Sequence, residues 1–238
     1  MGSAAAPAVG FFGKLPARGD FVRRDLPQDF VDAWDGWLAA GIAESKARLG
    51  ADWLAAFLEA PVWNFALAPG VAGPAIAGIF LPSVDRAGRY FPLTIASATA
   101  GAGPPTDPAW FAALAAAGVA ALAEDATLEG FEAAVAALPP PASCAARPFA
   151  GGMVAAQASG LVPAPALFWT QGGARVAASF AALPALPPPD WFDALLADRA
   201  AEASLPPPPP PPPPLAAFAP PGGPTQPSLA DTLFGDAP

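Results

Sequence analysis

Apolar residues along the chain fall either into short runs or into helical spacing, and the two patterns alternate. Residues 8–12 form a short apolar run that predicts a first strand, ended by Gly13. Residues 13–25 are dominated by Gly, Pro, Arg and Asp and predict a charged loop. Because proline is tolerated at the first helical position, Leu26 and Pro27 predict a helix that ends at Gly50. Its apolar residues recur at helical spacing and predict a stripe facing the core: Phe30, Trp34, Trp37, Leu38 and Ile42.

The same reading of apolar runs and turn residues predicts the remaining elements. We expect helices at 52–60, 107–123, 127–138 and 190–203, and strands at 62–68, 75–81, 89–97, 166–170 and 174–180. Asp85 and Gly88 supply turn chemistry between the second and third of these strands, which predicts a hairpin. Residues 65–82 approach the length of a membrane span, but prolines and glycines interrupt them, so two short buried strands are predicted instead.

This order of elements predicts an α/β fold, with a mixed sheet and helices on its faces in three layers. We expect one domain over residues 8–204, preceded by a flexible N-terminus at 1–7 and followed by a disordered proline-rich tail at 205–238. The tail contains nine consecutive prolines, residues 206–214, which predict a polyproline II rod. The segment SLADTLFGDAP beyond the rod could serve as a docking peptide.

Composition excludes several classes of function. The formal net charge of -9, without a basic patch, argues against nucleic-acid binding. The chain has no histidine and one cysteine, Cys144, so Ser-His and Cys-His pairs, multi-cysteine metal sites and intrachain disulfides are excluded. We therefore expect no cofactor, no metal and no small-molecule substrate. The N-terminus lacks the basic region of a signal peptide, which predicts a cytoplasmic protein without membrane insertion.

Two dense groups of charge stand out, because only 13% of the residues are charged. The first group follows the first strand, the second lies at the predicted hairpin, and together they give the candidate site residues: Lys14, Arg18, Asp20, Arg23, Asp85, Arg86 and Arg89. These side chains could pair with one another and hold the hairpin against the first strand. They could also form a recognition surface for a protein partner, and both readings can hold at once. A third reading is an enzyme that uses Asp20 or Asp85 with Lys14 or the arginines in a pocket.

The sequence resembles the TagF (ImpM) family of type VI secretion accessory proteins. The resemblance rests on GKLPARGDF at residues 13–21, APVWNF at 60–65, PSVDRAGRYFPL at 82–93 and LFWTQGG at 167–173, in that order. It implies a three-layer α/β/α sandwich. It also implies post-translational repression of a bacterial type VI secretion system through binding of its forkhead-associated scaffold protein, linked to threonine phosphorylation. Some family members carry a phosphatase domain, and the region after residue 204 is too short to be one.

Taken together, these observations predict a non-enzymatic regulator that binds a secretion-system component through the motif charges. The absence of histidine supports the non-enzymatic reading independently of the resemblance. The alternatives are the enzyme described above and an adaptor that acts through its proline-rich tail.

Overall fold

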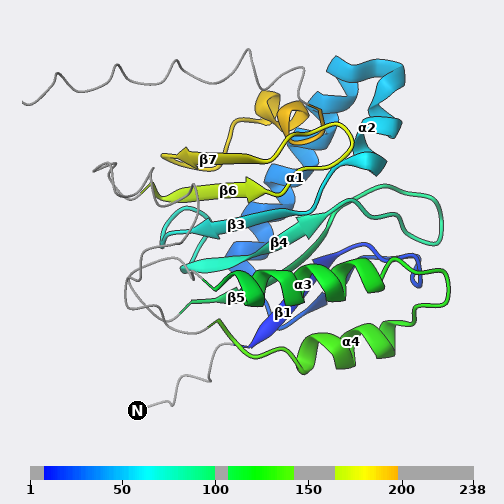
Figure 1. Cartoon of the computed structure of the whole chain (residues 1–238), viewed down its shortest axis with the longest axis vertical. Helices are drawn as coiled ribbons and strands as arrows, with labels where there is room; N and C mark the ends of the chain where they lie inside the picture. The colour runs from blue at the N-terminus through cyan, green and yellow to red at the C-terminus, as the bar shows by residue number, and fades with distance from the viewer. Residues whose placement is uncertain (1–7, 100–106, 142–163, 198–238) are drawn as a thin grey trace, which may run out of the picture. The chain divides into compact units, whose positions relative to one another are not determined.

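The computed structural model describes residues 8–99, 107–141 and 164–197, and its strands form one seven-stranded sheet (Figure 1). The strands follow the order β2-β1-β5-β4-β3-β6-β7. The elements along the chain are β1 (Val9–Gly13), β2 (Val22–Arg24), α1 (Gln28–Leu49), η1 (Gly50–Asp52), α2 (Trp53–Glu59), β3 (Trp63–Leu67), β4 (Ile76–Leu81), β5 (Leu93–Ala98), α3 (Pro108–Ala120), α4 (Leu128–Ala136), β6 (Ala166–Thr170), β7 (Ser179–Leu183) and η2 (Pro189–Leu195).

The prediction of a mixed sheet is wrong for the described strands, because every neighbouring pair is antiparallel. A parallel pair needs a crossover connection between adjacent strands. Here the helices connect strands that are not neighbours: α1 lies between β2 and β3, and α3 and α4 lie between β5 and β6. The strands that follow each other directly, β3, β4 and β5, pair antiparallel, and the predicted hairpin of β4 and β5 is confirmed.

Each face of the sheet carries its own hydrophobic cluster, since side chains alternate along a strand. Phe12, Phe65 and Phe80 belong to the cluster that contains α1, α2 and η2. Phe11 and Ile79 belong to the other cluster, which contains α3 and α4. Figure 1 shows α1 and α3 on opposite sides of the strands.

Helix α1 is organised as its apolar pattern predicts. Trp34 is fully buried and stacks near Phe30, with ring centroids 5.4 Å apart. Its indole N–H donates to Thr94 Oγ1 over 2.9 Å, and that of Trp37 donates to the Pro187 carbonyl over 2.8 Å. Both tryptophans are therefore core residues, as predicted, and their indole N–H groups join α1 to β5 and to the segment before η2.

Several elements differ from the prediction; among them, β2 was not predicted, β7 begins at a later residue, and the last helix is of another type. β2 lies in the predicted loop, because a strand of three residues with only Val22 buried has no periodicity to detect. β7 begins later than predicted, since a turn closed by Gly173 N–H and the Val176 carbonyl occupies the preceding residues. The last predicted helix is a 3₁₀ helix over its described part.

Some predictions concern residues outside the described ranges: the N-terminus at 1–7, Cys144 and the tail at 205–238. Within the described part, residues 65–82 contain the end of β3 and all of β4 with a turn between them, so the prediction of two short strands is confirmed. None of the helices described combines the length and the apolar character needed to cross a membrane.

Candidate functional site

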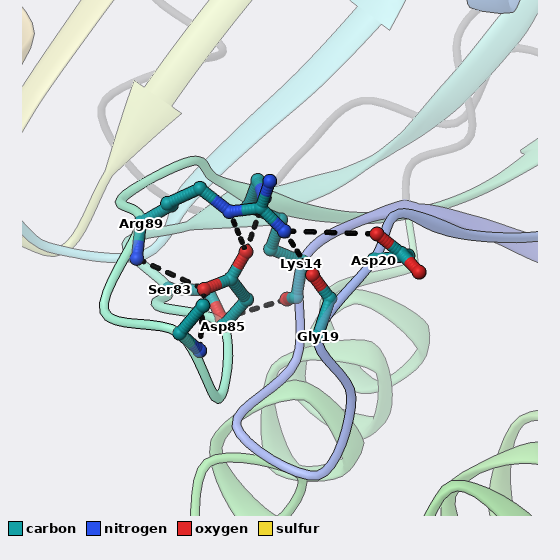
Figure 2. A network of polar contacts seen from close by, with 7 residues as sticks. Lys14, Gly19, Asp20, Ser83, Asp85 and Arg89 are labelled. Atoms are coloured by element: carbon teal, nitrogen blue, oxygen red, sulfur yellow. Dashed lines mark hydrogen bonds and ion pairs between the residues drawn. The ribbon is translucent and has the colours of Figure 1, made fainter.

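The two charged motifs meet at one end of the sheet. We call residues 14–21 the first loop and residues 82–92 the hairpin loop. β1 and β5 are antiparallel neighbours, with Phe12 opposite Thr94, so the loop that leaves β1 lies beside the loop that enters β5. Figure 2 shows side chains of both loops converging on one carboxylate, that of Asp85.

Asp85 is the centre of this network. Its side chain is fully buried, and one carboxylate oxygen, Oδ2, accepts from Lys14 Nζ and from Arg89 Nε at 2.7 Å. The other oxygen, Oδ1, accepts from the backbone N–H groups of Ala87 and Arg89, each at 2.9 Å. Lys14 is itself buried. The structure joins the two predicted groups of charge through a buried ion pair between residues 71 positions apart.

The surroundings of Asp85 decide its protonation. Burial alone would raise the pKa of this carboxyl, because a charge is costly away from water. The hydrogen bonds from Lys14, Arg89 and Ala87 outweigh burial and hold the pKa of Asp85 well below its usual range. A carboxylate that is this acidic and accepts four hydrogen bonds is a poor general base. Its contacts hold the hairpin loop together and join it to Lys14 of the first loop.

The lowered pKa of Asp85 predicts a pH-dependent contribution to stability. Such a group stabilises the fold above its unfolded pKa of about 3.9, and the contribution is lost as the pH falls toward the lower folded value. The difference in free energy of unfolding between the native protein and Asp85→Asn is therefore expected to be full at pH 7 and to narrow below about pH 5. Urea unfolding at pH 7, 5, 4 and 3 measures it, and a constant difference would contradict the prediction.

Further hydrogen bonds join the two loops around Asp85. Ser83 Oγ donates to the Lys14 carbonyl at 2.7 Å, and the Arg86 N–H donates to the Arg18 carbonyl at 2.9 Å. The Arg89 guanidinium donates to the Gly19 carbonyl, and its Nη2 lies 3.7 Å from a carboxylate oxygen of Asp20 (Figure 2). The two loops are therefore joined by both backbone and side-chain hydrogen bonds.

Close approach of the loops requires a glycine at the end of β1. Gly13 has a φ of +139°, and a Cβ there would meet the Pro92 carbonyl oxygen and come within 2.9 Å of Leu93 Cα. We expect Gly13→Ala to lower the free energy of unfolding by about 3 kcal/mol or more, because backbone atoms must shift. Gly36→Ala is the control: nothing lies near its Cβ position in α1, and alanine there is expected to add about 0.5–1 kcal/mol. Urea unfolding compares them, and equal stabilities would contradict the prediction.

The remaining predicted site residues stay at the surface. Arg18 pairs with Glu129 of α4 at 3.0 Å, and both side chains are largely exposed. Arg86 is exposed and its side chain has no hydrogen bond or ion pair to the part of the chain that the structure describes. Arg23 is not part of this group, because its guanidinium contacts Gln28 and the Leu26 carbonyl at the start of α1.

Sequence reasoning did not identify Phe21 as a member of the site. Its ring lies 4.7 Å from Lys14 Nζ, and it stacks against Phe12 with ring centroids 5.5 Å apart. Phe91 of the hairpin loop contacts it edge-on at 4.8 Å. The signal in the sequence was a single apolar residue directly after the charged residues of the first loop, which is too weak to single it out.

The part of the chain that contains both motif loops matches a known family of domains. The family model described as TagF N-terminal domain, type VI secretion system-associated, matches residues 10–138, and the chain belongs to this family. The match includes both motif loops, and it defines the chain as a type VI secretion system-associated protein.

A solved structure extends the similarity beyond the matched residues. The chain is 39% identical to the protein PA0076 from Pseudomonas aeruginosa PAO1, with a TM-score of 0.70. The similarity covers 80% of this chain and 94% of that chain. No curated protein matches the sequence.

Proposed function

We propose that this protein is a non-enzymatic repressor of a bacterial type VI secretion system, acting after translation in the cytoplasm by binding the forkhead-associated scaffold protein. One observation carries the proposal: the Lys14–Asp85–Arg89 network fixes the two motif loops into a single surface and leaves Arg18 and Arg86 exposed upon it. A fixed surface with exposed arginines suits protein recognition, since little side-chain and loop ordering is lost on binding.

The distribution of positive charge supports this surface as the binding face. Four of the chain's eleven Lys and Arg residues lie in the two motif loops, against two of its twenty Asp and Glu residues: Lys14, Arg18, Arg86 and Arg89, with Asp20 and Asp85. The rest of the chain is strongly acidic by comparison. A local excess of cations on an acidic protein steers a partner of opposite charge to this end of the sheet.

The enzyme alternative has less support from the same residues. It needs a titratable group in a pocket with a pKa suited to proton transfer. Asp85 has the opposite properties, since four donors occupy its oxygens and its pKa is lowered. Asp20, the other candidate, has a side chain that is 99% exposed, so it does not lie in a pocket.

Direct binding tests the proposal. The purified full chain is titrated against the forkhead-associated scaffold protein of the same bacterium by calorimetry, and secretion is measured in cells that overproduce or lack the protein. We expect a stoichiometric complex, reduced secretion on overproduction and increased secretion on deletion. Absence of any complex, or secretion that does not respond to either change, would overturn the proposal.

A chain truncated after residue 204 separates the folded domain from the tail. Under the proposal it binds the scaffold and represses secretion as the full chain does, provided that circular dichroism shows it folded. Loss of binding by a folded truncation would assign recognition to residues 205–238 and support the adaptor alternative.

A further inference from the structure

Phe21 is an exposed aromatic residue within the motif loops. Four large hydrophobic residues are exposed in the described part of the chain: Phe21, Leu54, Leu58 and Val119. Phe21 is the aromatic one among them, and 47% of it remains accessible. An aromatic ring left half in water costs free energy, which a partner that covers it recovers.

The Phe21 ring is held in place on its inner side. It packs nearly parallel to Phe12, at an interplanar angle of 12°, and edge-on to Phe91 at 75°. Lys14 Nζ lies 4.7 Å from the ring centroid, within the range of a cation–π contact. Three separate segments, the end of β1, the first loop and the hairpin loop, therefore fix this ring. A ring that is already fixed loses little conformational entropy when a partner binds.

The inner side of the Phe21 ring shields the Lys14–Asp85 ion pair from water, and this role accounts for the packing of that side only. The outer part of Phe21 is accessible although the pair beneath it is already buried. A partner that covers Phe21 would remove this remaining water and place the ring at the centre of a contact, where aromatic anchors contribute most.

The charges around Phe21 define the chemistry of the partner. The exposed charged residues of the two loops are three arginines and one aspartate, and Arg18 also pairs with Glu129 of α4: Arg18, Arg86, Arg89 and Asp20. The guanidinium of Arg89 reaches the carbonyl of Gly19 and the side chain of Asp20, so it lies directly beside the segment that carries Phe21. A complementary surface therefore has an apolar pocket for the ring and carboxylates at its border.

We propose that Phe21 is the anchor of the partner interface and inserts into an apolar pocket bordered by acidic residues on the partner protein. This inference rests on the proposed function, because it uses the forkhead-associated scaffold as the partner. It adds which residue carries the contact and what the opposing surface consists of.

Affinity measurements on the full chain test the anchor. Phe21→Ala is expected to weaken binding of the scaffold at least tenfold, and Phe21→Leu less, because leucine keeps part of the apolar surface. Leu58→Ala and Val119→Ala are controls that remove equally exposed apolar residues from α2 and α3, and they are expected to leave the affinity unchanged. Circular dichroism and the melting temperature of each variant show whether the fold is kept.

The acidic border is tested without touching the packed ring. The carboxylate of Asp20 is fully exposed, so Asp20→Lys is expected to leave the fold intact and to tighten binding several-fold at low salt, with a smaller gain at high salt. Asp190→Lys changes the same charge at an exposed position on η2 and is the control. Native affinity in folded Phe21→Ala overturns the anchor, and unchanged or weaker binding by Asp20→Lys overturns the acidic border. Failure of the native chain to bind the scaffold contradicts instead the proposed function.

Discussion

Replacing Asp85 by alanine is expected to lower the melting temperature by about 10 °C or more, the largest effect on stability of any single change considered for the two loops. The substitution removes four hydrogen bonds at once and leaves Lys14 buried without its carboxylate. An unpaired buried ammonium is far more costly than the pair was favourable. The hairpin loop also loses the acceptor that closes it through Ala87 and Arg89.

Thermal unfolding followed by circular dichroism measures this effect. Asp20→Ala is the matched control, because it removes a carboxylate from the first loop whose side chain is fully exposed, and it is expected to change the melting temperature by no more than about 2 °C. Similar melting temperatures for the two variants would show that the network contributes little. Lys14→Met in an Asp85→Leu background is expected to recover part of the loss, since both charges then leave the core.

Reversing the charge of Arg18 and Arg86 together is expected to weaken scaffold binding by about ten- to a hundredfold while leaving the fold intact. Arg86 has no side-chain partner within the described residues, and the pair of Arg18 with Glu129 is exposed at both ends. Exposed pairs contribute about 0–1 kcal/mol to stability, so their loss is tolerated. Two glutamates in their place instead repel an acidic partner and slow its association.

The control for this variant reverses two charges elsewhere. Lys46 lies over the Trp53 ring, and Arg175 pairs with Glu59; both positions are outside the motif loops. Lys46→Glu with Arg175→Glu makes the same change in net charge and is expected to bind the scaffold nearly as the native chain does. If the Arg18 and Arg86 variant is unfolded by circular dichroism, these arginines are structural and the interface loses its main support.

The sequence predicted the elements with a clear apolar pattern well, and it missed β2, which has almost none. Over 22 residues, α1 repeats its apolar spacing often enough to identify the helix and its core stripe. β2 has three residues and one buried side chain, which no pattern can distinguish from a loop. The neighbours of a strand cannot be read from spacing either, and the mixed sheet was predicted because helices between strands usually mark parallel crossovers.

The candidate site could likewise be predicted only in part from the sequence. Local composition identified both groups of charge, and only the three-dimensional structure divides them by role. Lys14 and Arg89 both pair with Asp85, Arg18 and Arg86 are exposed, and Arg23 contacts the start of α1. Phe21 was missed because its significance depends on packing against Phe12 and Phe91.

The pairing of β1 with β5 determines when this surface can form. β3, β4 and β5 follow one another in the chain and in the sheet, whereas Val9 of β1 pairs with Ser97 at the end of β5. During synthesis from the N-terminus, β1 has only β2 as a strand partner until β5 has left the ribosome, and such distant pairings form slowly. The first loop and the hairpin loop meet only after that step. A nascent chain therefore lacks the joined motif loops, and under the proposed function only a domain that has completed its central strands can bind the scaffold.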